Sequence, residues 1–460
     1  MKALILLFVS GIFAMFGGIF NLKKILPLFS VAALLTVLGY LIYDQNYGPE
    51  NLGNMLIFDS FSFKFTAIAV IGGILISWHS ASGFAYKIDS KGDLLALMFF
   101  VLCGLTCMVS YNNLLMLFLG IEILSIPLYV LAGSNVHSAK SNEASLKYFI
   151  MGAFATGFLL LGITLIYGAT HSFNLNEIRS MSETAINNFP GLLNTGLILI
   201  AVSFAFKIAA VPFHVWSPDV YEGSPTIVTA IMATIVKIGA IGAFLRLTIF
   251  LAPMLNYNWY FILAIISALT IITANFIAIL QTDFKRMMAY SSISHVGYIL
   301  LALLNPNTET TSTVAFYLIS YTLATIGIFS ILMIINKQHN ETNQFSIFNG
   351  LSKKTPFLGL LLSVFLLSLA GIPPLPGFFA KYAIFKQAVD THLWLVIIAI
   401  CGSAISIFYY FKAISVMFFA DNNYSTETNT EKNYLGYFAL IITFILLAAI
   451  SVFPSYFFNF

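Results

Sequence analysis

Charged residues are scarce in this chain. Only 8% of its 460 residues are Asp, Glu, Lys or Arg, whereas a typical soluble domain contains about 25%. Apolar residues make up 59% of the sequence, and this composition predicts a polytopic membrane protein. The net charge of +3 is small, and no basic run carries interleaved aromatic residues, so nothing indicates a nucleic-acid partner.

The sequence also lacks the motifs that bind cofactors. It has no glycine-rich phosphate loop, no dinucleotide fingerprint and no cysteine cluster of the kind that holds iron–sulfur centres. Cys103, Cys107 and Cys401 lie in apolar stretches without Cys or His partners, and we interpret them as packing residues. We therefore expect no cofactor and no metal in this chain, and we assign any redox chemistry to partner chains.

Apolar segments long enough to cross a membrane recur along the whole chain. About 20 helical residues span the hydrocarbon core of a bilayer, and we count about fourteen such segments with short links between them. The sequence therefore predicts an all-α membrane protein. The approximate cores of the segments are 3–20, 25–43, 64–80, 93–110, 113–132, 144–168, 194–211, 226–252, 259–280, 286–304, 312–336, 356–388, 392–420 and 434–457.

Lys and Arg residues in the loops predict the orientation of the chain, because cytoplasmic loops are enriched in them. The even-numbered loops and helix edges hold only Lys64 and Arg179, and the odd-numbered loops hold eleven such residues. We therefore predict that the odd loops are cytoplasmic and that both termini lie outside the cytoplasm. The eleven residues are Lys23, Lys24, Lys87, Lys91, Lys140, Lys285, Arg286, Lys337, Lys353, Lys354 and Lys432.

Two of the segments contain several prolines, at 206–225 and at 369–385. Proline removes a backbone donor and clashes with the preceding turn, so each helix is expected to break there. Paired interruptions in corresponding positions are typical of inverted repeats, with the functional site at the breaks. The predicted organisation is helices 1–3 in residues 1–90, a first repeat of helices 4–8 in 91–252, a second repeat of helices 9–13 in 253–420, and helix 14 in 421–460.

Several charged residues lie inside these apolar segments. A charge at the bilayer centre costs about 2.5–3.5 kcal/mol on insertion scales, and such residues usually line an ion path or pair with one another. Snorkelling of the lysines to helix ends is the alternative interpretation, and it is stronger where a residue lies near a helix start or a break. The residues are Glu122, Lys147, Lys207, Lys237, Lys381 and Lys412. Lys386 and Arg246 are interpreted as residues of the membrane interface.

Glu122 is a candidate partner for one of the buried lysines. A buried lysine loses proton affinity through desolvation and regains it beside a carboxylate, so such a pair can take up and release a proton. The alternative is a structural carboxylate bonded to a donor such as Ser125. His214 and His295 are either structural histidines or relays between lysines. A third interpretation is that these two histidines are axial ligands of a haem, but nothing else in the sequence forms a haem pocket.

Four motifs in combination resemble a known family. The resemblance, over about residues 90–420, is to the antiporter-like subunits of respiratory complex I, which are related to multi-subunit cation/proton antiporters and membrane-bound hydrogenases. GIEILSIPLYVLAG and EASLKYFIMGAFATGFLLLG are most similar to the subunit N branch of NADH–quinone oxidoreductase. The four motifs are FKIAAVPFHVWSPDVYEGSP, VKIGAIGAFLR, KRMMAYSSISHVGYILL and GIPPLPGFFAKY.

The resemblance implies roles for individual residues in proton translocation. Glu122 matches the family's helix-5 glutamate, which pairs with the helix-7 lysine, here Lys207. Lys237 matches the central relay lysine of helix 8. The remaining matches are His295 with the helix-10 relay, Lys381 with the helix-12 residue that communicates with one membrane face, and Lys147 with a helix-6 lysine of subunit N. His214 is added as a relay from its place in the first broken segment.

The expected function is therefore that of a non-redox membrane subunit of a proton-translocating NADH–quinone oxidoreductase in a bacterial cytoplasmic membrane. The resemblance implies other membrane and peripheral subunits as partners, and NADH, FMN, iron–sulfur clusters and quinone as cofactors and substrates of the whole complex. The main alternative is a subunit of a multi-component sodium/proton antiporter. The sequence shows no evident pocket for an organic substrate, which argues against a solute carrier. A role as a membrane scaffold does not explain the buried charges.

Overall fold

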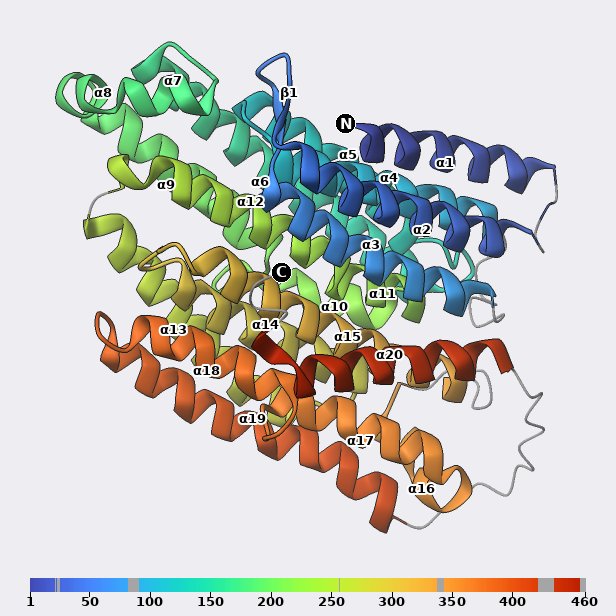
Figure 1. The fold of residues 1–460 in the computed structure, drawn as a ribbon. Helices are drawn as coiled ribbons and strands as arrows, with labels where there is room; N and C mark the ends of the chain where they lie inside the picture. Colours follow the sequence, from blue (N-terminus) through green and yellow to red (C-terminus); the bar gives the residue numbers. More distant parts are fainter. Residues whose placement is uncertain are drawn as a thin grey trace.

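The computed structural model describes residues 1–20, 22, 25–81, 91–255, 257–336, 343–420 and 434–455. These residues form a bundle of helices with one small hairpin, and the long helices run roughly parallel to one another (Figure 1). Five of the loop lysines used to predict the orientation lie outside the described residues, namely Lys23, Lys24, Lys87, Lys337 and Lys432.

The N-terminal part consists of three long helices and the hairpin. The strands β1 and β2 pair antiparallel, with Glu50 opposite Phe58. Helix α3 packs against α2 and α4, and α1 packs against α4, so these helices form one side of the bundle. The elements are α1 (Lys2–Ile19), α2 (Leu26–Asp44), η1 (Gln45–Tyr47), β1 (Glu50–Leu52), β2 (Leu56–Phe58) and α3 (Ser60–Ala81).

Polar residues occupy the N-cap position of several helices. The Asn113 side chain accepts a hydrogen bond from the Leu115 amide at 2.8 Å, and the Asp283 carboxylate accepts one from the Arg286 amide at 2.9 Å. Both satisfy donors that a helix start leaves free. The helices up to the first break are α4 (Lys91–Ser110), α5 (Leu114–Ala132), α6 (Ala139–Thr170), α7 (Leu175–Ser180), α8 (Ser182–Asn188) and α9 (Pro190–Lys207).

The first predicted break is present. Helix α9 ends at Lys207, and the chain becomes helical again only at Trp216. The carbonyl of Phe206, in the last turn of α9, accepts hydrogen bonds from the Ala209 amide at 3.0 Å and from the Trp216 indole at 3.2 Å. The elements after the break are α10 (Trp216–Gly223), α11 (Thr226–Ala233), α12 (Ile235–Leu251) and η2 (Ala252–Met254).

The second predicted break separates α17 from α18. Helix α17 ends at Ala370, and Gly371 follows with a φ of 83°, a left-handed conformation that glycine adopts without strain. The elements of this half are α13 (Tyr257–Leu280), α14 (Phe284–Ala302), α15 (Thr310–Asn336), η3 (Phe345–Phe348), α16 (Leu351–Lys354), α17 (Pro356–Ala370), α18 (Pro376–Ala388), α19 (Leu393–Phe419) and α20 (Tyr434–Val452).

The helices agree with the predicted membrane crossings. Within the described residues, twelve helical spans are long and apolar enough to cross a membrane, counting α11 and α12 as one. The remaining two predicted crossings correspond to α14 and to the broken pair α17–α18. The predicted all-α membrane fold with about fourteen crossings and two broken helices is therefore confirmed.

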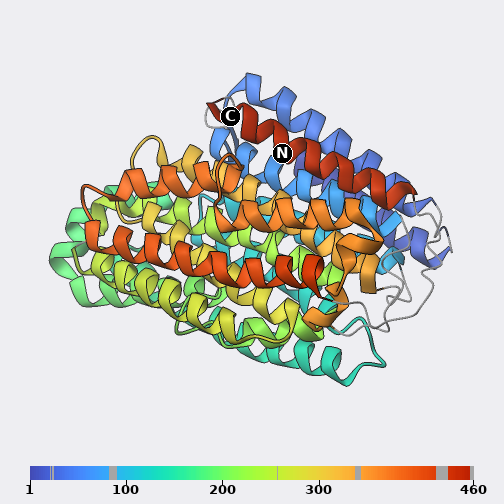
Figure 2. The same cartoon turned by 90° about the horizontal axis from the view of Figure 1, so that it is seen from below.

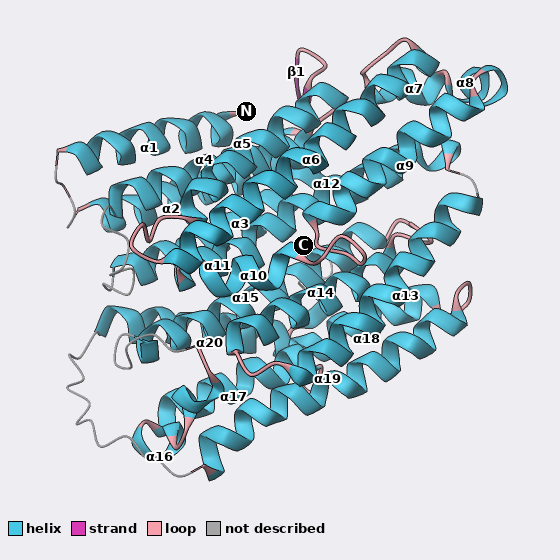
Figure 3. Ribbon diagram, turned by 180° about the vertical axis from the view of Figure 1, so that it is seen from behind, coloured by secondary structure: helices cyan, strands magenta, loops and turns pink. Residues whose placement is uncertain are grey.

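Burial separates inner helices from peripheral ones. The most apolar 18-residue stretches of α11–α12 and α15 are entirely buried. In α1, α6 and α20, only about a third of the corresponding stretch is buried. Helix α20 packs against both α15 and α3, which brings the C-terminal helix beside the N-terminal part (Figure 2). The view from behind shows the same arrangement, with β1 at the edge of an otherwise helical molecule (Figure 3). Of the buried charged residues described next, Lys237 lies on the inner helix α12, and Lys207, His295 and Lys381 lie on α9, α14 and α18.

Candidate functional site

Four of the predicted site residues are buried in the interior of the bundle. Lys207, Lys237, His295 and Lys381 expose only 4–6% of their surface. They come from α9, α12, α14 and α18, and α9 and α18 are the helices that flank the two breaks. The predicted interior position of these four residues is therefore seen in the structure.

Lys207 is the last residue of α9, and its partner is a serine. Its Nζ donates a hydrogen bond to Ser125 Oγ on α5 at 2.5 Å, and the Ser125 hydroxyl in turn donates to the Ile121 carbonyl. The Tyr148 ring lies 5.6 Å from the same Nζ. An ammonium group over an aromatic face is stabilised by the ring quadrupole.

Glu122 does not form the expected direct ion pair with Lys207 in the described part of the chain. It is partly buried on α5, three residues before Ser125, and residues at this spacing share one helix face. The Ser125 hydroxyl binds Lys207 instead. The suggested structural role, with Ser125 as the partner of Glu122, is not seen either, because Ser125 bonds Lys207 and the Ile121 carbonyl.

Lys237 and Lys381 bind backbone carbonyls. Lys237 Nζ donates to the Ser292 carbonyl of α14 at 2.9 Å. Lys381 Nζ donates to the Ala370 carbonyl and to Ser403 Oγ, both at 2.9 Å. Ala370 is the last residue of α17, so the second break provides the free carbonyl that the lysine uses.

His295 lies on α14 and has a hydroxyl at each ring nitrogen. The Tyr317 hydroxyl is 2.7 Å from Nδ1, and the Tyr410 hydroxyl is 3.3 Å from Nε2. The His295 ring centre is 6.0 Å from that of Tyr298, and the Tyr298 ring centre is 5.1 Å from Lys381 Nζ. The Tyr298 ring thus lies close to both the histidine and this lysine.

The other predicted site residues lie elsewhere. The Lys147 side chain is 42% exposed and forms ion pairs with Asp219 and Glu143, both at 2.7 Å, so the expectation of a buried lysine is wrong here. His214 is half-buried in the first break, with its ring centre 6.4 Å from that of Tyr290. Lys412, another lysine expected inside a span, donates to the Gln281 carbonyl at 3.0 Å, beyond the end of α13.

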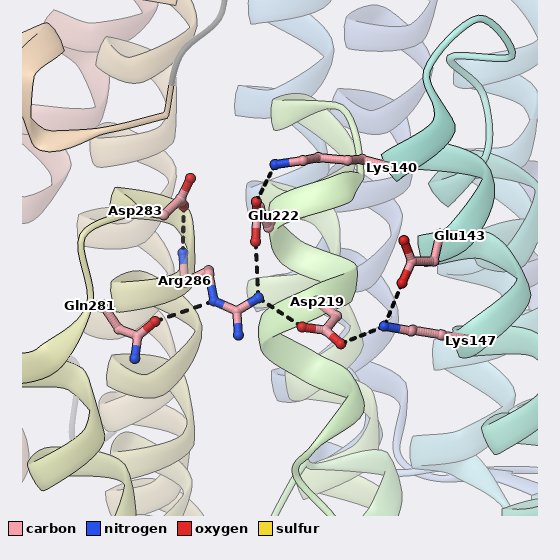
Figure 4. A network of polar contacts seen from close by, with 8 residues as sticks. All are labelled: Lys140, Glu143, Lys147, Asp219, Glu222, Gln281, Asp283 and Arg286. Carbon is pink, nitrogen blue, oxygen red and sulfur yellow. Dashed lines mark hydrogen bonds and ion pairs between the residues drawn. The ribbon is translucent and has the colours of Figure 1, made fainter.

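Lys147 belongs to an ionic network that joins α6, α10 and α14 (Figure 4). Arg286 Nη1 on α14 bonds Asp219 at 2.7 Å and Glu222 at 2.9 Å, both on α10. From α6, Lys147 bonds Asp219 at 2.7 Å and Lys140 bonds Glu222 at 2.6 Å. The short helix α10, which follows the first break, is therefore held by ion pairs to α14 and to α6.

Comparisons with known proteins assign the chain to a family. Residues 111–406 match the sequence model described as NADH:quinone oxidoreductase/Mrp antiporter, transmembrane. NADH-quinone oxidoreductase subunit N of Flavobacterium psychrophilum is 38% identical over 99% of both chains. The protein of the same name from Cytophaga hutchinsonii is 39% identical over 99% of this chain and 98% of its own length. The chain belongs to the NADH-quinone oxidoreductase subunit N family.

Solved structures share the fold of this chain. A chain of respiratory complex I from Thermus thermophilus, solved with bound aureothin, is 31% identical with a TM-score of 0.83, covering 99% of this chain and 98% of that one. Chains of an archaeal membrane-bound sulfane sulfur reductase and of the Mrp complex from Dietzia share the fold, with TM-scores of 0.88 and 0.85. Each covers 99% of this chain and 95% of the other, at 24% and 19% identity.

The structure of this subunit N family member also shows functional candidates that the sequence reasoning missed. The sequence predicts Ser125 only as a partner of Glu122, and no sequence pattern marks Tyr317 or Tyr410 as functional. Asp219 and Glu222 were visible as two carboxylates one helical turn apart in the first broken segment. Lys285, expected in a loop, is 4% exposed in the first turn of α14 and donates to the Ser224 carbonyl at 2.8 Å.

Arg246 lies inside the bundle. It is only 2% exposed, and its Nη1 contacts both Asp59 carboxylate oxygens at 3.1 and 3.0 Å. It also donates to the carbonyls of Tyr111 and Val109. An arginine has five donors in a fixed fork, and several of them here join α12 to α4 and to the start of α3.

The described residues contain no group of three or more His, Cys, Asp or Glu side chains that could hold a metal ion. Cys103 and Cys107 are buried, and Cys401 is exposed on the bundle surface. The polar interior includes lysine, histidine, serine and tyrosine side chains. Such groups can hold and pass on protons.

Proposed function

We propose that this chain is a membrane-arm subunit of a NADH–quinone oxidoreductase and carries one pathway for proton translocation. The observation that carries the proposal is the burial of Lys207, Lys237, His295 and Lys381 in helices that cross the membrane. Each buried charge has a cost that packing alone does not repay. Electron transfer from NADH to quinone in partner subunits would supply the energy.

The proposed chemistry is proton transfer between neighbouring side chains. Glu122 and Ser125 share one face of α5, so a change of the Glu122 rotamer would bring its carboxylate toward Lys207. A carboxylate favours the charged form of a neighbouring lysine, and its withdrawal favours release of the proton. Lys237, His295 and Lys381 would then take up and release the proton in turn, and His214 is an additional candidate relay.

The two breaks support a repeat organisation of this pathway. We assign residues 91–252 to the first antiporter-like repeat and 253–420 to the second, with helices 1–3 in 1–90 and helix 14 in 421–460. A broken helix ends or begins beside a buried lysine in each repeat, Lys207 in the first and Lys381 in the second. Freed carbonyls at membrane depth are tolerated where protein groups satisfy them, as Lys381 does for Ala370.

The partners and location follow from the same proposal. The chain would be a non-redox subunit, so NADH, FMN, iron–sulfur clusters and quinone would be bound by other subunits of the complex. It would reside in a bacterial cytoplasmic membrane, with both termini on the non-cytoplasmic side. The distribution of loop lysines and arginines supports this orientation.

The direct test uses the assembled complex in liposomes. Lys207→Ala and Glu122→Ala are each expected to lower proton pumping coupled to NADH oxidation, with the amount of assembled complex unchanged. The control is Lys2→Ala, because Lys2 is exposed and pairs with Asp44 at the end of the bundle. Normal pumping by both test variants would indicate that Lys207 and Glu122 have only a structural role.

A second candidate function is that of a sodium/proton antiporter subunit. The matching family description names both activities, and the Mrp chain shares the fold. The two functions are separated by the decay of a pH gradient across liposomes that contain the purified chain alone. Slow decay that sodium does not change is expected for a subunit that depends on its partners. Rapid sodium-dependent decay would favour the antiporter, and saturable uptake of an organic solute would contradict both.

A further inference from the structure

A line of hydrogen bonds runs through His295 and connects side chains from three helices. Ser291 Oγ on α14 is 2.5 Å from the Tyr410 hydroxyl on α19. The same hydroxyl is 3.3 Å from His295 Nε2, and the Tyr317 hydroxyl on α15 is 2.7 Å from Nδ1. All four side chains are at most 5% exposed. Each is therefore joined to the next without a gap.

The line has a direction across the bundle. Ser291 is roughly two turns inside α14 and His295 roughly three, which places them about 10 and 16 Å from the end of the helix at Phe284. The C-terminal part of α19 lies at this same end, because Lys412 donates to the carbonyl of Gln281 just before α14. Tyr317 is roughly two turns from the start of α15, which lies at the opposite end of the antiparallel pair α14–α15.

The chemistry of imidazole makes this line able to carry a proton. A neutral imidazole has one N–H donor and one acceptor nitrogen, so one tyrosine donates to His295 while the other accepts from it. A proton that reaches Ser291 Oγ releases the hydroxyl proton to Tyr410, and Tyr410 passes its own proton to Nε2. Nδ1 then releases its proton to Tyr317, which passes its hydroxyl proton onward.

The proton balance of this transfer is complete. One proton enters at Ser291 and one leaves at Tyr317, and each group keeps the number of protons it had at the start. Only the orientation of the hydroxyls and the tautomer of His295 are reversed. Rotation of the hydroxyls and a change of tautomer restore the starting arrangement.

From this geometry we infer that Tyr410 and Ser291 form a hydroxyl branch that delivers protons to His295 from the membrane face where α14 begins. Tyr317 is the relay on the far side of the histidine, in the half of the bundle that also contains Lys381. The inference rests on the proposed function in proton translocation, and it adds three relay residues to the lysine pathway.

The first test removes one hydroxyl and keeps the ring. Tyr410→Phe in the assembled complex in liposomes is expected to lower NADH-driven proton uptake to the level of a His295→Ala variant, with the amount of complex unchanged. Tyr321→Phe is the matched control, because the Tyr321 ring centre is 5.0 Å from that of His295 and its hydroxyl bonds neither ring nitrogen. This control is expected to pump like the wild type.

The second test separates proton transfer from packing at Ser291. Ser291→Ala removes the hydroxyl with little change in volume, whereas Ser291→Thr keeps a hydroxyl and adds a methyl group at a fully buried site. A relay role predicts low pumping in Ser291→Ala and pumping closer to wild type in Ser291→Thr. A packing role predicts the reverse order, because added volume in a packed interior is destabilising.

The outcomes distinguish this branch from the function itself. Wild-type pumping in Tyr410→Phe, together with lost pumping in His295→Ala and Lys207→Ala, would overturn the hydroxyl branch and leave the proposed function standing. Equal losses in Tyr410→Phe and Tyr321→Phe would also overturn it, since both rings would then act through packing. Normal pumping in all of these variants would overturn the proposed function as well.

Discussion

The buried lysines of this chain have partners of two kinds. Lys207 donates to a side-chain hydroxyl, and Lys237 donates to a backbone carbonyl of α14. Lys381 donates both to a backbone carbonyl of α17 and to the Ser403 hydroxyl. A carbonyl offers a hydrogen bond without a countercharge, and a carboxylate offers both. We therefore expect changes in charge along the proposed pathway to follow local rearrangements of donors and acceptors.

Arg246 permits a prediction about stability at the residue scale. Removing one member of a buried ion pair costs about 3–5 kcal/mol, and removing an exposed one about 0–1 kcal/mol. Arg246 is 2% exposed and its partner Asp59 is 29% exposed, so the expected cost of Arg246→Ala lies between these values. We expect a lower temperature for thermal dissociation of the purified complex.

The control for Arg246 is the same substitution at an exposed arginine. Arg179→Ala on α7 removes an exposed side chain and is expected to leave the dissociation temperature unchanged. An equal decrease in both variants would show that the Arg246 contacts contribute nothing specific to stability.

The second helix break supplies an acceptor for a buried lysine, because the Ala370 carbonyl at the end of α17 binds Lys381. Proline chemistry was sufficient to predict both breaks, because a ring in place of an amide hydrogen interrupts a helix in any environment. The distortion at Thr234, between α11 and α12, was not predicted, because no proline or glycine marks it. Thr234 is fully buried, and its hydroxyl donates to the Ala230 carbonyl at 2.6 Å.

Gly371 gives a prediction at the element scale. Its φ of 83° disfavours any residue with a Cβ, and a Cβ there would lie 3.0 Å from Lys381 Cδ and 3.3 Å from its Nζ. Gly371→Ala is therefore expected to displace the Lys381 ammonium group and to lower proton pumping by the assembled complex. Gly157→Ala is the matched control, since a Cβ at that exposed position of α6 meets no atom within 4 Å.

The ionic network around α10 gives a second prediction at this scale. Arg286→Ala leaves Asp219 and Glu222 with one lysine partner each, so α10 should be held less firmly against α14. We expect lower pumping and faster proteolysis near the first break, measured on the purified complex. A double-mutant cycle with Asp219→Asn should show coupling, because residues that share a network are not additive. Additive effects would contradict the network.

The sequence predicted the fold well and the contacts less well. Segment length and apolar composition predict crossings because a bilayer imposes them on any chain. The buried positions of Lys207 and Lys381 followed from their apolar neighbours. The Lys207–Ser125 bond and the two tyrosines at His295 were not predicted, because they join residues far apart in the sequence and depend on how the helices pack.

At the scale of the whole molecule, the inner helices are α11–α12 and α15. Helix α15 packs against α3, α17, α18 and α20, so it connects the N-terminal part to the second broken helix. Helix α20 packs on α15 and α3 beside the N-terminal part. The buried polar residues are thus enclosed by helices from both ends of the sequence.

The orientation of the molecule is tested by labelling. Cysteines introduced at Lys353 and Asn176, which are both exposed, are expected to react from opposite sides of the membrane, with Lys353 cytoplasmic. The background should lack Cys401, which is exposed on α19, whereas Cys103 and Cys107 are buried. Reaction from the same side would contradict the orientation and the number of crossings.

The carbonyl partners of Lys237 and Lys381 have a consequence for how this chain tolerates mutation. A main-chain carbonyl is present whatever residue occupies the position, so no single substitution at Ser292 or Ala370 can delete the acceptor. Small substitutions at these two buried positions therefore keep the acceptor, provided that the helices keep their course. At Ser125, any side chain without a hydrogen-bond acceptor removes the only acceptor that Lys207 uses among the described residues. Random mutagenesis of this chain should accordingly find inactivating changes at Ser125 far more often than at Ser292.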